Sequence, residues 1–235
     1  MARRIPGWLL AVLLLGCATL HRPVPVDPEV TFAAHQEHSG LAIDRLGRGR
    51  SGALRPAGWL RRPGAPTFVL LADGQRIAAL WPSGDRVVVR SATAREAPLV
   101  GEVTSSWDGG AIRLALRPAG SPAFRSDPFA REGGGTGPAT LTRAAETVID
   151  LRGTYRATLR DPSGAAVGWL RTRIGPYQEA SRIFDGVLPA AIQPELAAAA
   201  ATALNAEIDW IEDHALNVYR GSGGGPLERS IPAPR

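Results

Sequence analysis

The sequence contains no lysine and only one cysteine, Cys17. All 27 basic residues are therefore arginine, and acidic residues are interspersed among them. A chain with one cysteine forms no intramolecular disulfide bond. Aromatic residues make up only 6% of the chain. Nucleic-acid binding requires a clustered basic face with stacking aromatics, so we expect no nucleic-acid partner.

Hydrophobic runs long enough to cross a bilayer are also absent near the N-terminus, where the apolar segment extends only from Trp8 to Leu15. A membrane-spanning helix needs roughly 20 apolar residues. Arg3 and Arg4 precede this segment, and Gly16 follows it. A basic start, a short apolar run and a small residue are typical of an export signal. The sequence therefore predicts a signal peptide at residues 1–16.

The segment Leu14-Leu15-Gly16-Cys17 resembles the lipobox of bacterial lipoproteins. The resemblance implies cleavage before Cys17 and acylation of its thiol and new amino group, with fatty chains such as palmitate. The alternative is ordinary secretory cleavage at a small residue. Ala18, rather than aspartate, follows the cysteine. By resemblance to the proteobacterial sorting rule, this favours the outer membrane, with the domain facing the periplasm.

The composition divides the rest of the chain into a tether, a domain and a tail. Residues 17–40 are expected to form the acylated N-terminus and a proline-rich tether, because Pro23, Pro25 and Pro28 favour an extended chain. Residues 41–220 are expected to form a single domain. Residues 221–235 begin with a glycine-rich stretch and are expected to be a disordered tail.

The region from Leu41 to Ile174 has the pattern of antiparallel β-structure. Asp73-Gly74 lies between two apolar runs, which is a strong signal for a hairpin. Alternating apolar side chains predict strands with one buried face at 111–117 and 155–160. A long loop is expected between them, at about 118–138.

The C-terminal region changes to a helical pattern. Pro194 lies where a helix would begin, and apolar residues then recur at three- and four-residue steps up to Val218. The sequence therefore predicts a helix from about 194 to 219, packed on the sheet through one apolar stripe. The acidic residues fall mostly on the opposite side, and they are Glu207, Asp209, Glu212 and Asp213.

These patterns predict an α+β fold, in which a twisted, mainly antiparallel β-sheet of about six to nine strands is packed by the C-terminal α-helix. A curved sheet covered by helices resembles the half-barrel of the lipoprotein carrier and receptor proteins. The resemblance concerns the fold alone and implies no site.

The residues with metal-binding or catalytic chemistry do not form a recognised pattern. His35-Gln36-Glu37-His38 carries metal-type ligands, but its spacing departs from the helical zinc motifs, so we expect no metal site there. His214 is a candidate base, and Asp150 with Asp161 is a candidate carboxylate pair. No nucleophile elbow or phosphate-binding loop accompanies them. We therefore assign no catalytic, cofactor-binding or metal-binding residue, and only Cys17 as a lipidation site.

Tryptophans provide the last candidate feature. Trp59, Trp81, Trp107 and Trp169 lie in or near predicted strands and are interpreted as packing residues. The alternative is that they line an apolar cavity between sheet and helix.

The sequence favours a membrane-anchored lipoprotein that is not an enzyme and binds envelope proteins. A carrier of a lipid or acyl chain is the second hypothesis, and a hydrolase of unknown class is the third.

Overall fold

The structure is a computed structural model of the chain. It describes residues 26–37, 40–47, 49–58, 64–108, 110–133, 139–142, 153–174 and 182–222. The predicted signal peptide, Cys17 and the tail from residue 223 lie outside these ranges.

The described chain forms thirteen strands followed by one long helix. The strands are β1 (Phe32–Glu37), β2 (Gly40–Leu46), β3 (Arg50–Pro56), β4 (Phe68–Ala72), β5 (Gln75–Ser83), β6 (Arg86–Arg90), β7 (Leu99–Asp108), β8 (Ala111–Pro118), β9 (Phe124–Ser126), β10 (Ala130–Glu132), β11 (Thr154–Arg160), β12 (Ala166–Ile174) and β13 (Arg182–Val187). The helix is α2 (Pro194–Ser222).

The strands close into an antiparallel barrel. Neighbours in the chain pair with each other from β1 to β9 and from β10 to β13. Two long-range pairings complete the ring, because β1 pairs with β13 and β9 pairs with β11. Twelve strands form the closed barrel, and β10 pairs with β11 beside the closure. The expected open sheet of about six to nine strands is therefore wrong.

Local turn chemistry explains the hairpins that the sequence predicts. Asp73 and Gly74 connect β4 to β5 with φ angles of 51° and 77°, a backbone conformation that aspartate tolerates and glycine adopts without strain. In the turn between β11 and β12, Asp161 Oδ1 accepts hydrogen bonds from the amides of Ser163 and Ala165. The hairpin predicted at Asp73-Gly74 is confirmed.

Alternation along the strands separates the interior of the barrel from its outer face. Ile112, Leu114 and Leu116 of β8 are fully buried, and so are the inward side chains of β11, which are Tyr155, Ala157 and Leu159. These side chains belong to one continuous hydrophobic core. The predicted one-sided burial of these two strands is confirmed.

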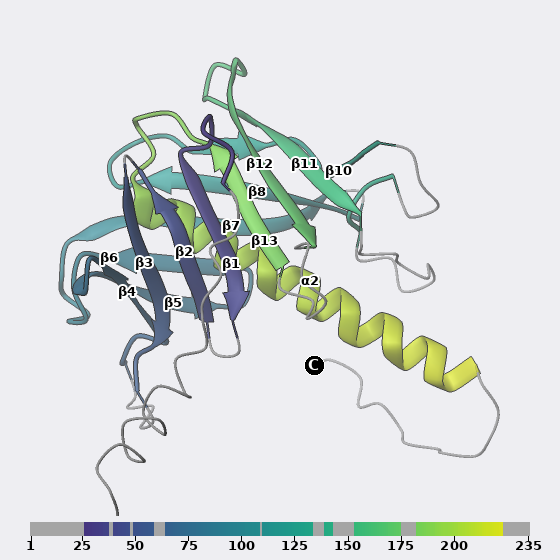
Figure 1. The fold of residues 1–235 in the computed structure, drawn as a ribbon, viewed down its shortest axis with the longest axis horizontal. Coiled ribbons are helices and arrows are strands. Elements are labelled where there is room, and N and C mark those ends of the chain that lie inside the picture. The colour runs from purple at the N-terminus through teal and green to yellow at the C-terminus, as the bar shows by residue number, and fades with distance from the viewer. Residues whose placement is uncertain are drawn as a thin grey trace, which may run out of the picture.

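Helix α2 runs through the interior of the barrel. It contacts β5 to β8 on one wall and β1 and β2 on the opposite wall, and Figure 1 shows it passing between these walls. Residues 196–201 are all buried, although consecutive residues point to different sides of a helix. A helix on an outer face would bury only one stripe. The start at Pro194 is confirmed, but the expected packing through one apolar stripe is wrong.

Small residues allow the helix to fit inside. Barrels of about eight strands are filled by their own side chains, so a larger barrel leaves space for another element. Alanine occupies positions 197–201, all of which are buried. A Cβ added at Gly101 of β7 would lie 2.9 Å from Cδ2 of Leu196, so the glycine also lets the wall approach α2.

The barrel begins earlier in the chain than the sequence predicts. Strand β1 starts at Phe32 and lies between β2 and β13, so residues 32–37 belong to the barrel and not to the expected tether at 17–40. Thr31 fixes the approach to this strand, because its hydroxyl accepts a hydrogen bond from the amide of Leu188 at 2.8 Å. The part of the expected tether that precedes residue 26 lies outside the described residues.

Candidate functional site

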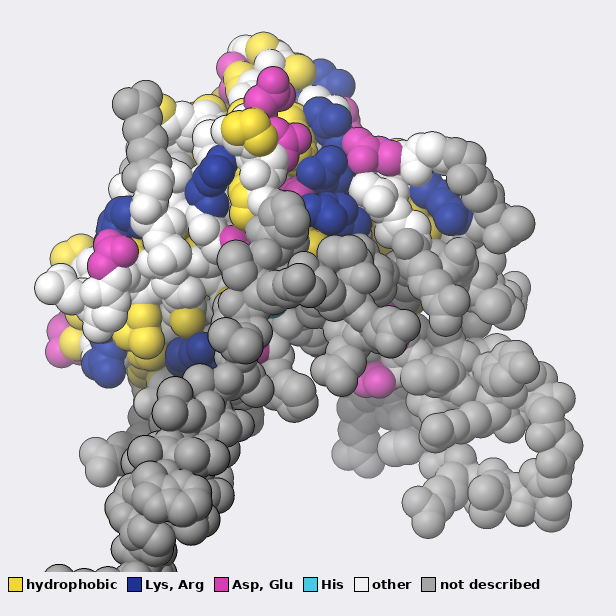
Figure 2. Space-filling view, viewed as in Figure 1, with side chains coloured by type: hydrophobic (Ala, Val, Ile, Leu, Met, Phe, Trp, Pro, Cys, Tyr) yellow, Lys and Arg dark blue, Asp and Glu magenta, His cyan; other side chains and the backbone are white. Residues whose placement is uncertain are grey.

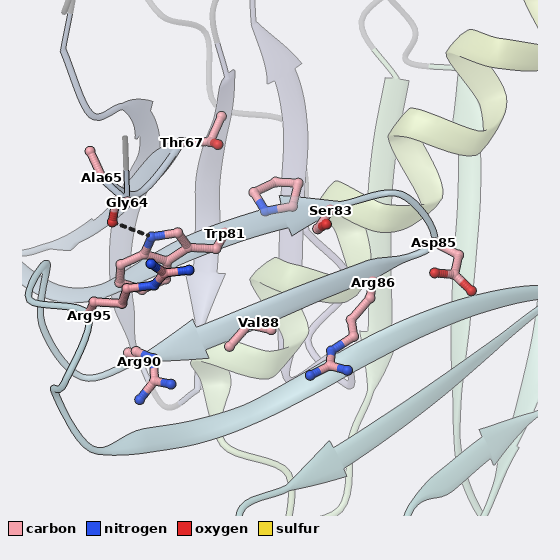
Figure 3. Close-up of a pocket in the computed structure, with 11 residues that line it drawn as sticks. Gly64, Ala65, Thr67, Trp81, Ser83, Asp85, Arg86, Val88, Arg90 and Arg95 are labelled. Atoms are coloured by element: carbon pink, nitrogen blue, oxygen red, sulfur yellow. Dashed lines mark hydrogen bonds between the residues drawn. The ribbon is translucent and has the colours of Figure 1, made fainter. Parts of the chain in front are cut away.

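A groove on the outer face of β5 and β6 is an open concave surface lined by aromatic and charged side chains. It has a volume of about 660 Å³. Its polar and aromatic lining includes Trp81, Arg86, Arg90 and Arg95, which Figure 3 shows on the same side of the two strands. Gly64, Ala65 and Thr67 form its edge beside β4.

Strand alternation determines which side chains enter the groove. Val87 and Val89 of β6 are buried in the interior, so Arg86, Val88 and Arg90 point outward. Leu80 of β5 is buried in the same core, and Trp81 therefore points outward beside them. The indole is held in place because its Nε1 donates a hydrogen bond to the carbonyl oxygen of Gly64 at 3.2 Å.

The arginines of the groove differ in how they are held. Arg86 Nε lies 3.0 Å from Glu102 Oε2 in an ion pair. Arg90 Nη1 donates a hydrogen bond to the carbonyl oxygen of Ala97 at 2.7 Å, which fixes the side chain without neutralising it. Arg95 is exposed, and Figure 3 shows it beside the Trp81 indole. Within the described residues neither Arg90 nor Arg95 forms an ion pair, so the groove carries positive charge.

Positive charge continues from the groove across the neighbouring strands. Arg113 and Arg117 are at outward positions of β8, and Arg125 is exposed on β9. Acidic side chains are present as well, because Asp85 lines the groove and Glu102 Oε1 lies 3.5 Å from Arg117 Nη1. We call the groove together with these outward side chains of β6 to β9 the basic face.

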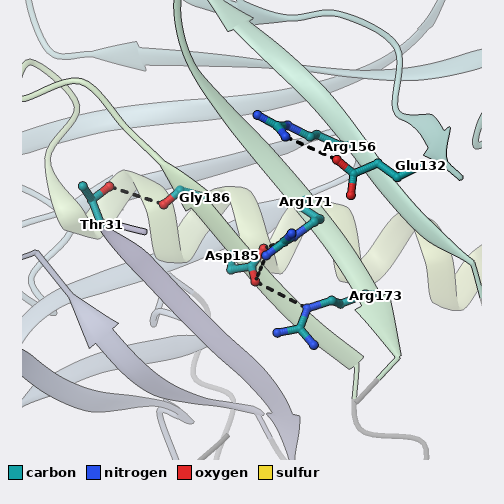
Figure 4. A network of polar contacts seen from close by, with 7 residues as sticks. All are labelled: Thr31, Glu132, Arg156, Arg171, Arg173, Asp185 and Gly186. Atoms are coloured by element: carbon teal, nitrogen blue, oxygen red, sulfur yellow. Dashed lines mark hydrogen bonds and ion pairs between the residues drawn. The ribbon is translucent and has the colours of Figure 1, made fainter. Parts of the chain in front are cut away.

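The opposite wall of the barrel carries a network of paired charges instead, and Figure 2 shows basic and acidic side chains next to one another on this face. Arg171 contacts both carboxylate oxygens of Asp185, at 2.7 and 2.8 Å, and this contact raises the pKa of Arg171 above its ordinary value. Arg173 Nε lies 3.5 Å from the same carboxylate, and Arg156 Nη1 lies 3.3 Å from Glu132 (Figure 4). These interactions link β10 to β11 and β12 to β13, and each of the three arginines has a carboxylate partner, although Arg171 and Arg173 share that of Asp185.

The interior contains a buried carboxylate, that of Glu207 on α2. Ser105 Oγ donates a hydrogen bond to its Oε1 at 2.6 Å, and Trp107 Nε1 donates to its Oε2 at 2.9 Å. Glu207 is 4% exposed, so its expected placement on the solvent side of the helix is wrong. The three side chains connect α2 to β7 and hold the helix at a fixed position along its axis.

The acidic residues that follow Glu207 lie where the helix leaves the barrel. Arg182 of β13 forms an ion pair with Glu212. Burial raises the pKa of Asp209 above its ordinary value, and the nearby charge of Glu212 raises it further. Asn205 Nδ2 donates a hydrogen bond to Asp209 at 2.9 Å. These contacts hold α2 in place at this end of the barrel. The described side chains that make them are not arranged as a catalytic pair.

The candidate metal ligands His35 and Glu37 each contact a different side chain. His35 Nδ1 lies 2.8 Å from Asp44 Oδ2, and Glu37 forms an ion pair with Arg55. His38 lies outside the described residues. In the part of the chain that the structure describes, histidine, cysteine and acidic side chains form no group of three or more that could hold a metal ion.

The candidate catalytic residues are not brought together in the described structure. Asp161 caps its own turn, and the hydrogen bond from the Ser163 hydroxyl lowers the pKa of its carboxyl group. Asp150 and the side chain of His214 lie outside the described residues. The expected carboxylate pair of Asp150 and Asp161 therefore stays a sequence hypothesis.

The tryptophans do not line a common cavity. Trp81 lies in the outer groove, Trp107 bonds to Glu207 inside, and Trp169 lies on the opposite wall, with Arg156 4.4 Å and Arg171 5.0 Å from its ring centre. Trp59 lies outside the described residues. The void between α2 and the strands that include Phe32 and Leu114 measures only about 10 Å³. This space is too small for an acyl chain.

Comparisons with protein-family models, with curated proteins and with solved structures gave no match. In the described part of the chain, none of the helical segments combines the length and hydrophobicity needed to cross a membrane.

The sequence analysis did not identify the groove as a site. One signal for it was present, because Arg86, Val88 and Arg90 alternate with two valines and must share the outer face. The indole of Trp81 and the exposed Arg95 reach this face from a different strand and a loop, and only the fold brings them together.

Proposed function

We propose that the protein is a lipid-anchored lipoprotein of the cell envelope that binds its partner through the outer face of the barrel and catalyses no reaction. The anchor is the acylated Cys17, and the domain faces the periplasm from the outer membrane. The binding site is the groove around Trp81.

The observation that carries the proposal is the contrast between the two sides of the barrel wall. The interior is occupied by α2, and the void beside the helix measures about 10 Å³. The groove outside measures about 660 Å³ and combines an indole with three arginines and one acidic residue, Asp85. Arg86 is paired with Glu102, whereas Arg90 and Arg95 form no ion pair within the described residues. A ligand of appreciable size therefore has space in the outer groove and not in the void beside Phe32 and Leu114, and a second hollow of about 530 Å³ lies where α2 begins, beside Pro194.

The chemistry of the groove indicates the charge of the partner. Guanidinium groups donate several hydrogen bonds in a fixed planar arrangement that matches carboxylate and phosphate oxygens. An indole adds apolar contact area beside them. The groove therefore favours an anionic partner that also presents an apolar or flat surface to Trp81.

The anchor is tested by the variant Cys17→Ser in the full chain. We expect the wild-type protein to fractionate with membranes and its mature N-terminus to be Cys17 carrying acyl chains, as measured by mass spectrometry. The Cys17→Ser variant should lose the acyl mass and remain unprocessed or be released. Ala18→Ser, which leaves the cysteine in place, is the matched control and should be acylated as in the wild type.

Two results would contradict the anchor. One is an unchanged mass and membrane fraction in Cys17→Ser. The other is a mature wild-type chain that begins at a residue other than Cys17.

A further inference from the structure

The basic face carries features of a membrane-contacting surface besides its charge. Leu99 lies at the start of β7 and is 43% exposed. Among the described residues, it is the large hydrophobic side chain that is exposed to solvent. It pairs in register with Arg90, so it borders the groove. Trp81 lies on the same side of the barrel. An exposed leucine, a tryptophan and a group of arginines are thus gathered on one wall.

The opposite wall does not share these features. Its arginines at positions 156, 171 and 173 have carboxylate partners within 3.5 Å. Its tryptophan, Trp169, lies beneath two of these arginines. The barrel is therefore asymmetric, because the described arginines 156, 171 and 173 of one wall all have carboxylate partners, whereas Arg90 and Arg95 of the other have none among the described residues.

We propose that the basic face lies against the surface of a membrane whose lipids carry anionic phosphate head groups. The proposal rests on the lipid anchor of the proposed function and names the partner of the same groove. Arginines near such a surface are attracted to it, while tryptophan and leucine side chains enter the boundary between head groups and acyl chains.

The position of the anchor favours this contact over one with a distant partner. Residues 18–25 lie between Cys17 and Val26, the first described residue, and the chain from Cys17 to Val26 spans at most about 32 Å. An acylated Cys17 therefore keeps residue 26 within this distance of the bilayer.

The strand order places the basic face near the tether as well. Successive strands from β1 to β7 are antiparallel, so the start of β1, the end of β6 and the start of β7 lie at the same end of the barrel. Arg90, Arg95 and Leu99 are thus at the end from which the tether emerges. A short tether and a basic, partly apolar surface at the same end of the molecule match a protein that lies on its membrane.

The proposal is tested by binding of the full chain to lipid vesicles. Cys17→Ser serves as the background, because permanent acyl anchoring would hide weaker contacts. Its binding is measured by co-sedimentation with vesicles of phosphatidylcholine alone and of phosphatidylcholine mixed equally with phosphatidylglycerol. We expect stronger binding to the mixed vesicles, and a loss of this difference as salt is added, because salt screens exposed charges.

Two substitutions within that background locate the contact. Arg95→Gln should lower the partition coefficient for mixed vesicles roughly 5-fold, which corresponds to one arginine near an anionic surface. Leu99→Ser should lower binding to both kinds of vesicle. Arg173→Gln on the opposite wall is the matched control and should leave binding unchanged. Residues 1–16 are the same in every variant, so they do not affect these ratios.

Equal binding to both vesicle types, or equal losses in Arg95→Gln and Arg173→Gln, would overturn the proposal. Circular dichroism of each variant verifies that the barrel is folded. The anchor is judged separately, by the acyl mass on Cys17. If Cys17 is acylated but the basic face does not bind vesicles, the proposed membrane contact is refuted and the lipid anchor is not.

Discussion

Replacing Ala199 with leucine is expected to destabilise the barrel by about 3 kcal/mol or more, because the added atoms have no space between the two walls. Ala199 is completely buried and lies within the run of alanines that passes between them. Leucine is only slightly below alanine in helix propensity, so the loss would come mainly from packing. Thermal and denaturant unfolding followed by circular dichroism measure it.

Ala206→Leu is the matched control on the same helix. Ala206 is exposed, so the same added atoms would project into solvent and change the free energy of unfolding by about 0.5 kcal/mol or less. Similar unfolding midpoints for Ala199→Leu and Ala206→Leu would show that α2 is not enclosed.

Replacing Glu207 with alanine is expected to cost about 3 kcal/mol, because a buried hydroxyl and a partly buried indole N–H lose their acceptor. The Ser105 hydroxyl and the Trp107 indole both donate to this carboxylate, and Ser105 is itself buried. Removal of the side chain also leaves a cavity in the core. Denaturant unfolding gives the loss of stability, and tryptophan fluorescence reports the change around Trp107.

Glu207→Gln is the control for this second substitution. Glutamine keeps the length of the side chain and one oxygen acceptor, so we expect a smaller loss than with alanine. A loss equal to that of Glu207→Ala would mean that the hydrogen bond to the retained oxygen contributes nothing.

The local elements of the fold could be predicted from the sequence, because their signals are local. Asp73-Gly74 and the turn at Asp161 specify hairpins through backbone conformations that few residues adopt. Alternation in β8 and β11 identified the inward side chains. These features depend only on neighbouring residues.

The closure of the barrel could not be predicted in the same way. It depends on pairing of β1 with β13, where Phe32 lies opposite Gly186, and of β9 with β11. Strand β9 has only three residues and falls within the stretch that was expected to be a loop. Segments this short carry too little periodicity to be recognised, and the sequence has no signal for which distant strands will meet.

The position of the helix was misjudged for a related reason. The larger apolar residues of α2 form a stripe, and this pattern is typical of a helix on an outer face. Alanine is compatible with both exposed and buried positions, so the residues between the large ones did not reveal burial on every side. Glu207 was placed in solvent because a buried carboxylate is rare without partners, and its partners are on a strand about 100 residues away in the chain.

The enclosure of α2 inside the barrel is the central claim, and thiol labelling tests it most directly. Cys17→Ser removes the only cysteine, so single cysteines can then be placed at Ala197, Ala198, Ala199 and Ala200. Successive positions differ by about 100° around a helix, so the four together sample all its sides. We predict that each reacts with a maleimide at least about 100-fold more slowly than a cysteine at Ala206, because labelling requires opening of the barrel. If any one of the four reacts as fast as the cysteine at Ala206, the helix has a side exposed to solvent and does not fill the barrel.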